Sequence, residues 1–241
     1  MDILDLYEQW ARTYDRQRNL TRDLDRSVSR EILSRFHFRV ILEFGCGTGK
    51  NTSLLGRIGD KVLAMDFSPA MIRRARAKRN SADIFFAVAD IARPWPCPDA
   101  SVDLITVNLV LEHVHDLNAV FAEASRCLVP GGRLFICELH PFRQYRGVKA
   151  HFQTGGATVQ IPAFTHHISD FLATAQRCRL ILENFREWRH AEDQGGLPRL
   201  VSFMFEKRSK VMAIRPIRPS SDSTGRRRRR KPSSSRPPAT T

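Results

Sequence analysis

Three glycines, Gly45, Gly47 and Gly49, alternate with other residues directly after a short apolar run at 39–44. Glycine lets the backbone turn tightly and lets a ligand lie against the main chain, because no Cβ atom stands in the way. At the end of a strand and the start of a helix, such a loop can hold a nucleotide. A tight turn without a ligand uses the same residues, so this interpretation needs support from elsewhere in the chain.

An acidic residue, Asp66, ends the next apolar run about 20 residues after the first glycine. A carboxylate at that distance can accept hydrogen bonds from ribose hydroxyls. Lys50 occupies the place of the third glycine in the dinucleotide pattern. That glycine lets the helix pack closely around a pyrophosphate, so its absence disfavours a dinucleotide.

Polar side chains also stand at the carboxyl ends of the predicted strands, where open α/β sheets bind their ligands. They are Glu43, Asp66, Asp90, Asn108 and Glu138. Their carboxylates create a field that favours a cation. A sulfonium nucleoside fits this field better than an anionic cofactor does.

The elements that must position these residues alternate between strand and helix patterns. Five apolar runs predict strands at 39–44, 61–66, 83–90, 102–109 and 133–139. Three stretches between them predict helices at 50–58, 69–79 and 117–128. Ser68 is expected to cap the second helix, with Pro69 in its first turn. The alternation predicts a doubly wound α/β fold, with a mostly parallel sheet covered by helices on both faces.

The two ends of this body have patterns of their own. A predicted helix at 168–178 is followed by two strand-like stretches, 179–189 and 200–207, whose polar connection favours an antiparallel pair at the sheet edge. Near the N-terminus, apolar and aromatic side chains share one helical face: Ile3, Leu4, Tyr7, Trp10, Ala11 and Tyr14. We expect residues 1–36 to form a helical cap, as a lid over a cleft or as a plain packing helix.

The charge of the chain is concentrated at one end. The net charge is +14 over 241 residues, yet most of it comes from the segment 209–241, which holds five consecutive arginines. This Pro-, Ser- and Arg-rich segment has too little apolar surface to fold, so we predict a disordered tail behind a domain at 37–208. The tail is either inert or makes nonspecific contacts with polyanions such as nucleic acid or anionic lipid.

Composition also limits the setting of the protein. No run approaches the ~20 apolar residues of a membrane span, and the acidic start is unlike a signal peptide, so we expect a cytoplasmic protein. Five cysteines without a CxxC pair predict free, reduced thiols. The histidines at 113 and 115, and at 166 and 167, lack the spacing of a zinc motif, so we expect no metal site.

Six motifs follow one another along the chain. They are Ile41–Gly49, Ala64–Met71, Val88–Asp90, Asp103–Thr106, Leu109–His113 and Leu128–Gly132. Together they resemble class I S-adenosylmethionine-dependent methyltransferases, above all the ubiquinone/menaquinone methyltransferases and the malonyl-carrier-protein O-methyltransferases. The resemblance covers roughly residues 5–208 and implies S-adenosylmethionine as the cofactor. It also implies a seven-stranded sheet in the order 3-2-1-4-5-7-6, with the last strand antiparallel, and it leaves the arginine-rich tail without a counterpart.

The resemblance assigns roles to single residues. The cofactor-binding set that it implies is Tyr7, Glu43, Gly45, Gly47, Gly49, Asp66, Phe67, Asp90, Ile91 and Asn108. Within this set, Asp66 holds the ribose hydroxyls, and Phe67 packs on the adenine. Asp90 and Ile91 contact the adenine edge. Tyr7 resembles a lid tyrosine of the family, as does Tyr14.

Methyl transfer from a sulfonium is an in-line displacement, so the enzyme mainly aligns the reactants and excludes water. A base is needed only if the acceptor must lose a proton. Four histidines are candidates, since histidine titrates near neutrality: His113, His140, His166 and His167. The candidate catalytic residues that we select are His140, His113 and Tyr14.

The segment 138–145 follows the fifth predicted strand. Its polar residues are expected to line the acceptor side of the cleft, where Arg143 can pair with an acceptor carboxylate. A solvated connection without a role in binding is the alternative.

Three functions fit these patterns. The leading one is methyl transfer to a small-molecule or carrier-protein-bound acceptor, whose identity the sequence does not contain. The second is a nucleic-acid-binding or RNA-modifying methyltransferase that uses the tail, although the body lacks the interleaved aromatic and basic residues of an RNA-binding module. The third is a catalytically silent fold that binds S-adenosylmethionine as a regulator.

Overall fold

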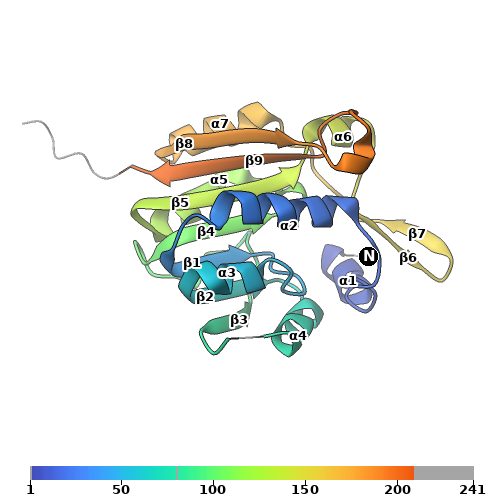
Figure 1. Ribbon diagram of the computed structural model, residues 1–241, viewed down its shortest axis with the longest axis horizontal. Coiled ribbons are helices and arrows are strands. Elements are labelled where there is room, and N and C mark those ends of the chain that lie inside the picture. The colour runs from blue at the N-terminus through green and yellow to red at the C-terminus, as the bar shows by residue number, and fades with distance from the viewer. Residues whose placement is uncertain (1, 80, 209–241) are drawn as a thin grey trace, which may run out of the picture. The chain divides into compact units, whose positions relative to one another are not determined.

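Seven strands form one sheet in the computed structural model, which describes residues 2–79 and 81–208 (Figure 1). The strands are β1 (Phe38–Phe44), β2 (Gly59–Asp66), β3 (Ile84–Val88), β4 (Val102–Asn108), β5 (Leu128–Leu139), β8 (Leu180–Trp188) and β9 (Leu200–Lys207). Their order is β3-β2-β1-β4-β5-β9-β8. Neighbours are parallel except where β9 pairs with β5 and β8. Counted within this sheet alone, the arrangement is the expected 3-2-1-4-5-7-6, with the last strand antiparallel.

Helices cover both faces of the sheet. One face carries α2 (Leu20–Leu33), α3 (Thr52–Ile58) and α4 (Pro69–Ala77), and the other carries α5 (Leu117–Cys127) and α7 (Ile168–Arg177). Leu55 of α3 and Phe171 of α7 are buried on opposite sides, at 1% and 3% exposure. The doubly wound α/β fold predicted from the sequence is confirmed.

The central strands are largely buried because both of their faces are covered. In β1, Ile41 and Leu42 are fully buried and Phe44 is 1% exposed. The outer strand β8 is exposed at every position between its two ends. The more polar β8 is thus typical of an edge strand, whereas the other edge strand, β3, is apolar throughout.

Several short elements escaped the sequence prediction. They are α6 (Pro141–Tyr145), the 3-10 turns η1 (Leu111–His113) and η2 (Ala191–Asp193), and the separate hairpin of β6 (His151–Thr154) and β7 (Ala157–Gln160). The hairpin turns at Gly155 and Gly156, with φ of 55° and 81°. Its strands have four residues each, too few for a period of two to stand out. α2 was also not predicted as a separate helix.

The N-terminal helix is shorter than its apolar stripe. α1 (Ile3–Trp10) follows the cap residue Asp2. It ends before Tyr14, which lies in the irregular segment that follows. Leu6 and Trp10 pack with Phe152 and Ile161 in a small cluster apart from the two main cores. The stripe is therefore only partly helical, because the chain turns toward the glycine loop after Trp10.

The predicted tail, 209–241, lies outside the described residues. The boundary between a cap at 1–36 and a domain at 37–208 stays a prediction. Within residues 2–79 and 81–208, no helix is both long and apolar enough to cross a bilayer.

Candidate active site

A cavity of about 430 Å³ opens at the carboxyl ends of β1, β2, β3 and β4. Most of the expected site residues line it: Tyr7, Tyr14, Glu43, Gly45, Gly47, Asp66, Phe67, Asp90, Ile91, Asn108 and His113. The parallel strands bring these residues together, because their carboxyl ends meet at one edge of the sheet. Two expected residues, Gly49 and His140, do not line this cavity.

The glycine loop between β1 and α3 forms the floor of the cavity. Gly45 has a φ of 71°, and a Cβ added there would lie 2.0 Å from Cγ2 of Val110. Gly47 has a φ of 53°, and its Cβ position lies 4.0 Å from the ring of Tyr14. Both residues are therefore restricted to glycine by backbone conformation, and Gly45 also by space. Gly49 instead packs against Ala75, at 3.4 Å, so it shapes the loop from behind.

Asp66 is built into this loop. Its carboxylate accepts hydrogen bonds from the backbone N–H of Gly47 at 2.8 Å and of Ser68 at 2.9 Å. Burial raises the pKa of Asp66 to about 6, against the lowering effect of these two hydrogen bonds. Phe67 follows, with its ring centroid 5.5 Å from that of Tyr7. The loop and the end of β2 are thus fixed to each other by the side chain expected to hold the ribose.

Two more buried carboxylates face the same space. Glu43 accepts a hydrogen bond from the Thr52 hydroxyl at 2.6 Å, and burial raises its pKa to about 7. Asp25, on α2, accepts from the amides of Asn108 at 2.6 Å and Asn51 at 2.7 Å, and burial raises its pKa. No ion pair within 4.0 Å joins either of them to a cation of the described chain. The cavity therefore gathers buried carboxyl groups that lack a paired cation, and burial favours their protonated forms in the ligand-free protein.

The sequence analysis missed the contribution of α2. Besides Asp25, it supplies Arg22, whose guanidinium donates to the carbonyls of Tyr14 at 2.7 Å and Gln17 at 3.0 Å. The guanidinium also lies 3.9 Å from the ring centroid of Tyr14, while its Nε is buried without a hydrogen-bond partner among the described residues. The one available signal was an arginine and an aspartate on the same helical face as Val28 and Ile32.

Tyr7 and His113 form a hydrogen-bonded pair in the cavity wall, with 2.8 Å between the hydroxyl and Nε2. His113 Nδ1 lies 3.0 Å from the carbonyl oxygen of Pro162. Since a carbonyl only accepts, Nδ1 carries the proton and Nε2 accepts from Tyr7. Burial lowers the pKa of His113 and raises that of Tyr7, so the pair is neutral at pH 7.

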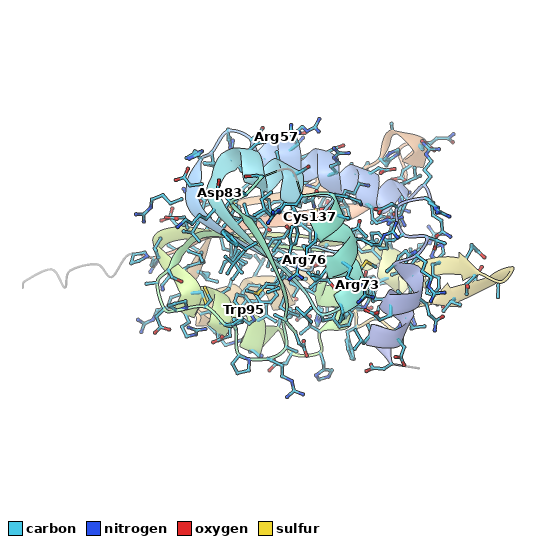
Figure 2. The ribbon with its side chains drawn as sticks, turned by 90° about the horizontal axis from the view of Figure 1, so that it is seen from below. Arg57, Arg73, Arg76, Asp83, Trp95 and Cys137 are labelled. Carbon is cyan, nitrogen blue, oxygen red and sulfur yellow. The ribbon has the colours of Figure 1, made fainter. Side chains whose placement is uncertain are left out.

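The adenine end of the expected site is more open. Asp90 accepts from the backbone N–H of Ala92 at 2.9 Å, and its side chain is half exposed. Ile91 is buried, and its carbonyl accepts from the indole of Trp95 at 3.0 Å. Trp95, labelled in Figure 2, packs against Phe44 with ring centroids 4.3 Å apart. Trp95, which packs in the core, thereby fixes the position of Ile91.

The N-terminal helix closes over this site by polar contacts. Glu8 on α1 accepts from the Ser68 hydroxyl at 2.6 Å and from the backbone N–H of Ala70 at 2.8 Å. Arg73, labelled on α4 beside α1 in Figure 2, lies 3.7 Å from the same carboxylate. Asp15 accepts from the Thr48 hydroxyl at 2.7 Å. The helix and its following segment are thus joined to both the glycine loop and α4.

The structure places His140 and Arg143 outside the lining of this cavity. His140 is fully buried, caps α6 by accepting from Phe142 N, and has its Nε2 2.9 Å from a carboxylate oxygen of Glu187. Arg143 pairs with Asp193 at 2.9 Å. Both side chains connect α6 to β8 or to the loop that follows it, and neither lines the cavity.

The other two candidate histidines have backbone or surface contacts. His166 Nε2 bonds to the carbonyls of Leu111 and Val114, at 3.1 and 2.7 Å. His167 bonds to the hydroxyl of Tyr145 on the exposed surface. Neither lines the cavity.

Glu138 has a positioning role that its place at a strand end did not reveal. Its carboxylate accepts from the backbone N–H of Val110 at 3.0 Å and of Leu111 at 2.9 Å. Burial raises its pKa to about 8. Glu138 therefore holds the start of η1, and with it the wall of the cavity that carries Val110 and His113.

Comparison with known proteins agrees with this geometry. Residues 42–136 match the family model described as "Methyltransferase domain". The chain is 29% identical over 140 residues to a ubiquinone biosynthesis O-methyltransferase of Xanthomonas oryzae pv. oryzae, covering 56% of this chain and 57% of that protein. It is 42% identical over 99 residues to a malonyl-[acyl-carrier protein] O-methyltransferase of Hahella chejuensis, covering 40% of this chain and 35% of that protein. The chain thus spans little more than half the length of the first of these relatives.

Among solved structures, the N-methyltransferase NodS of Bradyrhizobium japonicum, in complex with S-adenosyl-L-homocysteine, has a TM-score of 0.64 at 19% identity. The match covers 87% of this chain and all of that one. At this identity the likeness concerns the fold alone. Sheet order, glycine loop and the match over residues 42–136 are all similar to those of class I S-adenosylmethionine-dependent methyltransferases. S-adenosylmethionine is the cofactor of that class.

Proposed function

We propose that the protein transfers the methyl group of S-adenosylmethionine to a small-molecule or carrier-protein-bound acceptor. The observation that carries this proposal is the set of buried carboxylates around the glycine loop, Asp25, Glu43 and Asp66. Burying a carboxylate without a cation is costly, and a ligand with a sulfonium and an ammonium group would relieve that cost. A dinucleotide would add phosphate charges to a site that is already negative.

The residues present fit this cofactor. Asp66 would hold the ribose hydroxyls, and Phe67 and Ile91 would enclose the adenine. The methionine end would lie toward α2, where Arg22 Nε and Asn51 Oδ1 are both buried without a partner among the described residues. A guanidinium donor and an amide acceptor suit a carboxylate and an ammonium group respectively.

When bound, S-adenosylmethionine supplies an electrophilic methyl group on its sulfonium. The chain's own residues then have three tasks. α1 excludes water from the cavity, and η1 aligns the acceptor against the cofactor site. Tyr7 and His113 can accept the proton of an acceptor hydroxyl, with the Tyr7 proton moving to Nε2 of His113 as its oxygen takes up the new one.

The acceptor is the least determined part of the proposal. The two relatives are named for ubiquinone biosynthesis and for a malonyl carrier protein, so both classes are candidates here. The cations that line the cavity are Arg22 and Lys50, which belong to α2 and the glycine loop rather than to η1. Since Arg143 is engaged elsewhere, this favours an acceptor whose methylated end is uncharged.

Incubation with S-adenosylmethionine labelled in its methyl group, together with fractionated cell extract, tests the proposal. Label is expected in a low-molecular-weight product or in a carrier protein. Label that enters RNA alone would contradict it. Absence of transfer from a protein that binds the cofactor would favour the silent regulator.

The tail offers a second arm of this experiment. A chain that ends at Arg208 retains every residue of the cavity, so turnover on a small acceptor should be unchanged. Any affinity that the tail gives for RNA should fall steeply with salt, because it would come from counterion release. If truncation abolishes turnover while cofactor binding persists, the tail delivers the acceptor, and a polyanion becomes the leading candidate.

A further inference from the structure

The segment 139–169 contains no aspartate or glutamate, although acids occur throughout the rest of the body. It does contain Arg143, Arg146 and Lys149. The segment includes α6, the β6–β7 hairpin and the loop that leads to α7. Figure 1 shows α6 and the hairpin at the same end of the sheet as α1.

Large apolar side chains are exposed in this segment. Phe142 is 48% exposed, Tyr145 53%, Val148 39% and Phe164 42%. We call these four residues the α6 face. Isolated exposed apolar residues are ordinary, but four within one acid-free segment need an explanation.

Short-range contacts hold the α6 face together. The ring centroids of Phe142 and Tyr145 are 6.2 Å apart. Val148 N donates to the carbonyl of Arg143 at 3.0 Å, which folds the chain back after α6. The side chain of Gln144 donates to the carbonyl of Phe164 at 3.3 Å. The four side chains therefore belong to one small surface fixed by the backbone.

Two cations flank this surface. Arg146 and Lys149 are exposed, and neither forms an ion pair with the described residues, whereas Arg143 is paired with Asp193. Aromatic and aliphatic side chains beside unpaired cations are the combination found where proteins rest on an anionic bilayer, with the apolar groups below the headgroups and the cations among them.

A protein partner fits this surface less well. A stable protein interface takes about 800 Å² from each side and has a buried anchor at its centre. The α6 face consists of four partly exposed side chains around a single helical turn. Insertion of a few side chains into lipid needs no large matching surface.

The α6 face is connected to the wall of the cavity that carries His113. Phe164 N donates to the carbonyl of Glu112 in η1 at 2.7 Å, and Pro162 is bonded to His113. The loop that carries Phe164 thus also supports η1, which lies in the wall of the cavity proposed for the acceptor. A bilayer contact there would bring the acceptor side of the cavity to the lipid surface.

We propose that the α6 face, with Arg146 and Lys149, contacts an anionic lipid bilayer. This inference goes beyond methyl transfer, and its test uses neither cofactor nor acceptor, so its failure and that of the proposed function are distinguishable.

The test places an indole on the α6 face of the full chain by Phe142→Trp. The native tryptophans Trp10, Trp95 and Trp188 are 3%, 4% and 7% exposed, so a contact-dependent change in fluorescence reports the introduced side chain. Vesicles of phosphatidylcholine with phosphatidylglycerol, brominated on their acyl chains, quench an indole only if it enters the bilayer. The matched control is Phe85→Trp, at a residue of β3 that is 51% exposed.

We expect quenching with Phe142→Trp on anionic vesicles, none with Phe85→Trp, and little on phosphatidylcholine alone. Adding Arg146→Glu and Lys149→Glu to Phe142→Trp should weaken binding at least tenfold. Arg57→Glu with Lys61→Glu, the same charge change far from the α6 face, should weaken it less. If the full chain binds vesicles but the indole at position 142 is not quenched, another segment makes the contact and the proposal is overturned. Absence of vesicle binding overturns it as well.

Discussion

The two sides of the cavity are built in different ways. On the cofactor side, the ligand-facing groups come from a backbone loop and from side chains at strand ends, and Asp66 ties them together through two backbone N–H groups. On the side that we propose for the acceptor, Tyr7 comes from α1 and His113 from a 3-10 turn, and Pro162 supports them from a loop. One side is fixed by the sheet, and the other by hydrogen bonds between segments distant in sequence.

The largest expected effect comes from the cofactor side. Gly45→Ala puts a Cβ within 2.0 Å of Val110 and forces a φ of 71° on a residue with a side chain. We expect cofactor affinity to fall at least about 100-fold, which corresponds to ~3 kcal/mol, as measured by calorimetry. Gly155→Ala is the control, since it has a φ of 55° with nothing within 4 Å of the added Cβ. Equal losses in both variants would show that backbone strain and not the cavity wall is responsible.

The acceptor side should respond in turnover rather than in cofactor affinity. Tyr7→Phe and His113→Gln remove the proposed proton path, and general base catalysis contributes about 10²–10⁴-fold. We expect kcat to fall within that range while cofactor affinity changes little, with the loss greatest at a pH where the acceptor hydroxyl is neutral. If cofactor affinity fell as much as kcat, Tyr7 and His113 would belong to the cofactor side, and the two sides of the cavity would not differ in function.

Most residues that the sequence analysis selected for the cofactor side line one cavity, and the reason is physical. A glycine with positive φ and a carboxylate after a buried strand are determined locally, so Gly45 and Asp66 can be recognised from spacing. Asp25 and Arg22 are determined by how α2 crosses the sheet, which no local pattern specifies. His140 shows the opposite case, because a buried histidine that caps a helix looks the same in sequence as one that faces a cleft.

Removal of α1, the proposed lid, tests the difference between the two sides of the cavity next. The apolar contacts of α1 lie in a small cluster apart from the main cores, and its other contacts are polar. Deletion of residues 1–15 should therefore leave a folded body, with turnover reduced at least about tenfold because water enters the cavity. Circular dichroism and turnover measure the two effects. A deletion that fails to fold would make α1 a core element and not a lid.

A smaller effect is expected in how stability and cofactor binding depend on pH. Glu43 and Asp66 have folded-state pKa values of about 7 and about 6, above their ordinary range, so the folded protein holds protons that the unfolded chain releases. As the pH rises from 5.5 to 7.5, these protons are lost and the ligand-free protein becomes less stable. His113 has a lowered pKa, so its contribution to stability increases over the same rise in pH. A cationic ligand should bind more tightly as these carboxylates ionise.

Thermal unfolding with and without S-adenosylmethionine tests this over the same pH range. The increase in Tm caused by the cofactor should be a few degrees larger at pH 7.5 than at pH 5.5. Glu43→Gln should reduce that difference. A cofactor effect independent of pH would mean that the carboxylates bind no positive charge.

The central claim is that the carboxylates and the glycine loop form a site for S-adenosylmethionine, and calorimetric titration of the full chain tests it most directly. We expect binding of S-adenosylmethionine, no micromolar binding of NAD, and an affinity at least about 100-fold lower in Asp66→Ala, since two ribose hydroxyls lose a charged acceptor and each such hydrogen bond contributes about 1.5–3 kcal/mol. Asp83→Ala, at an exposed position before β3 that Figure 2 labels, is the matched control and should bind normally. Unchanged affinity in Asp66→Ala, or micromolar binding of NAD, would contradict the account.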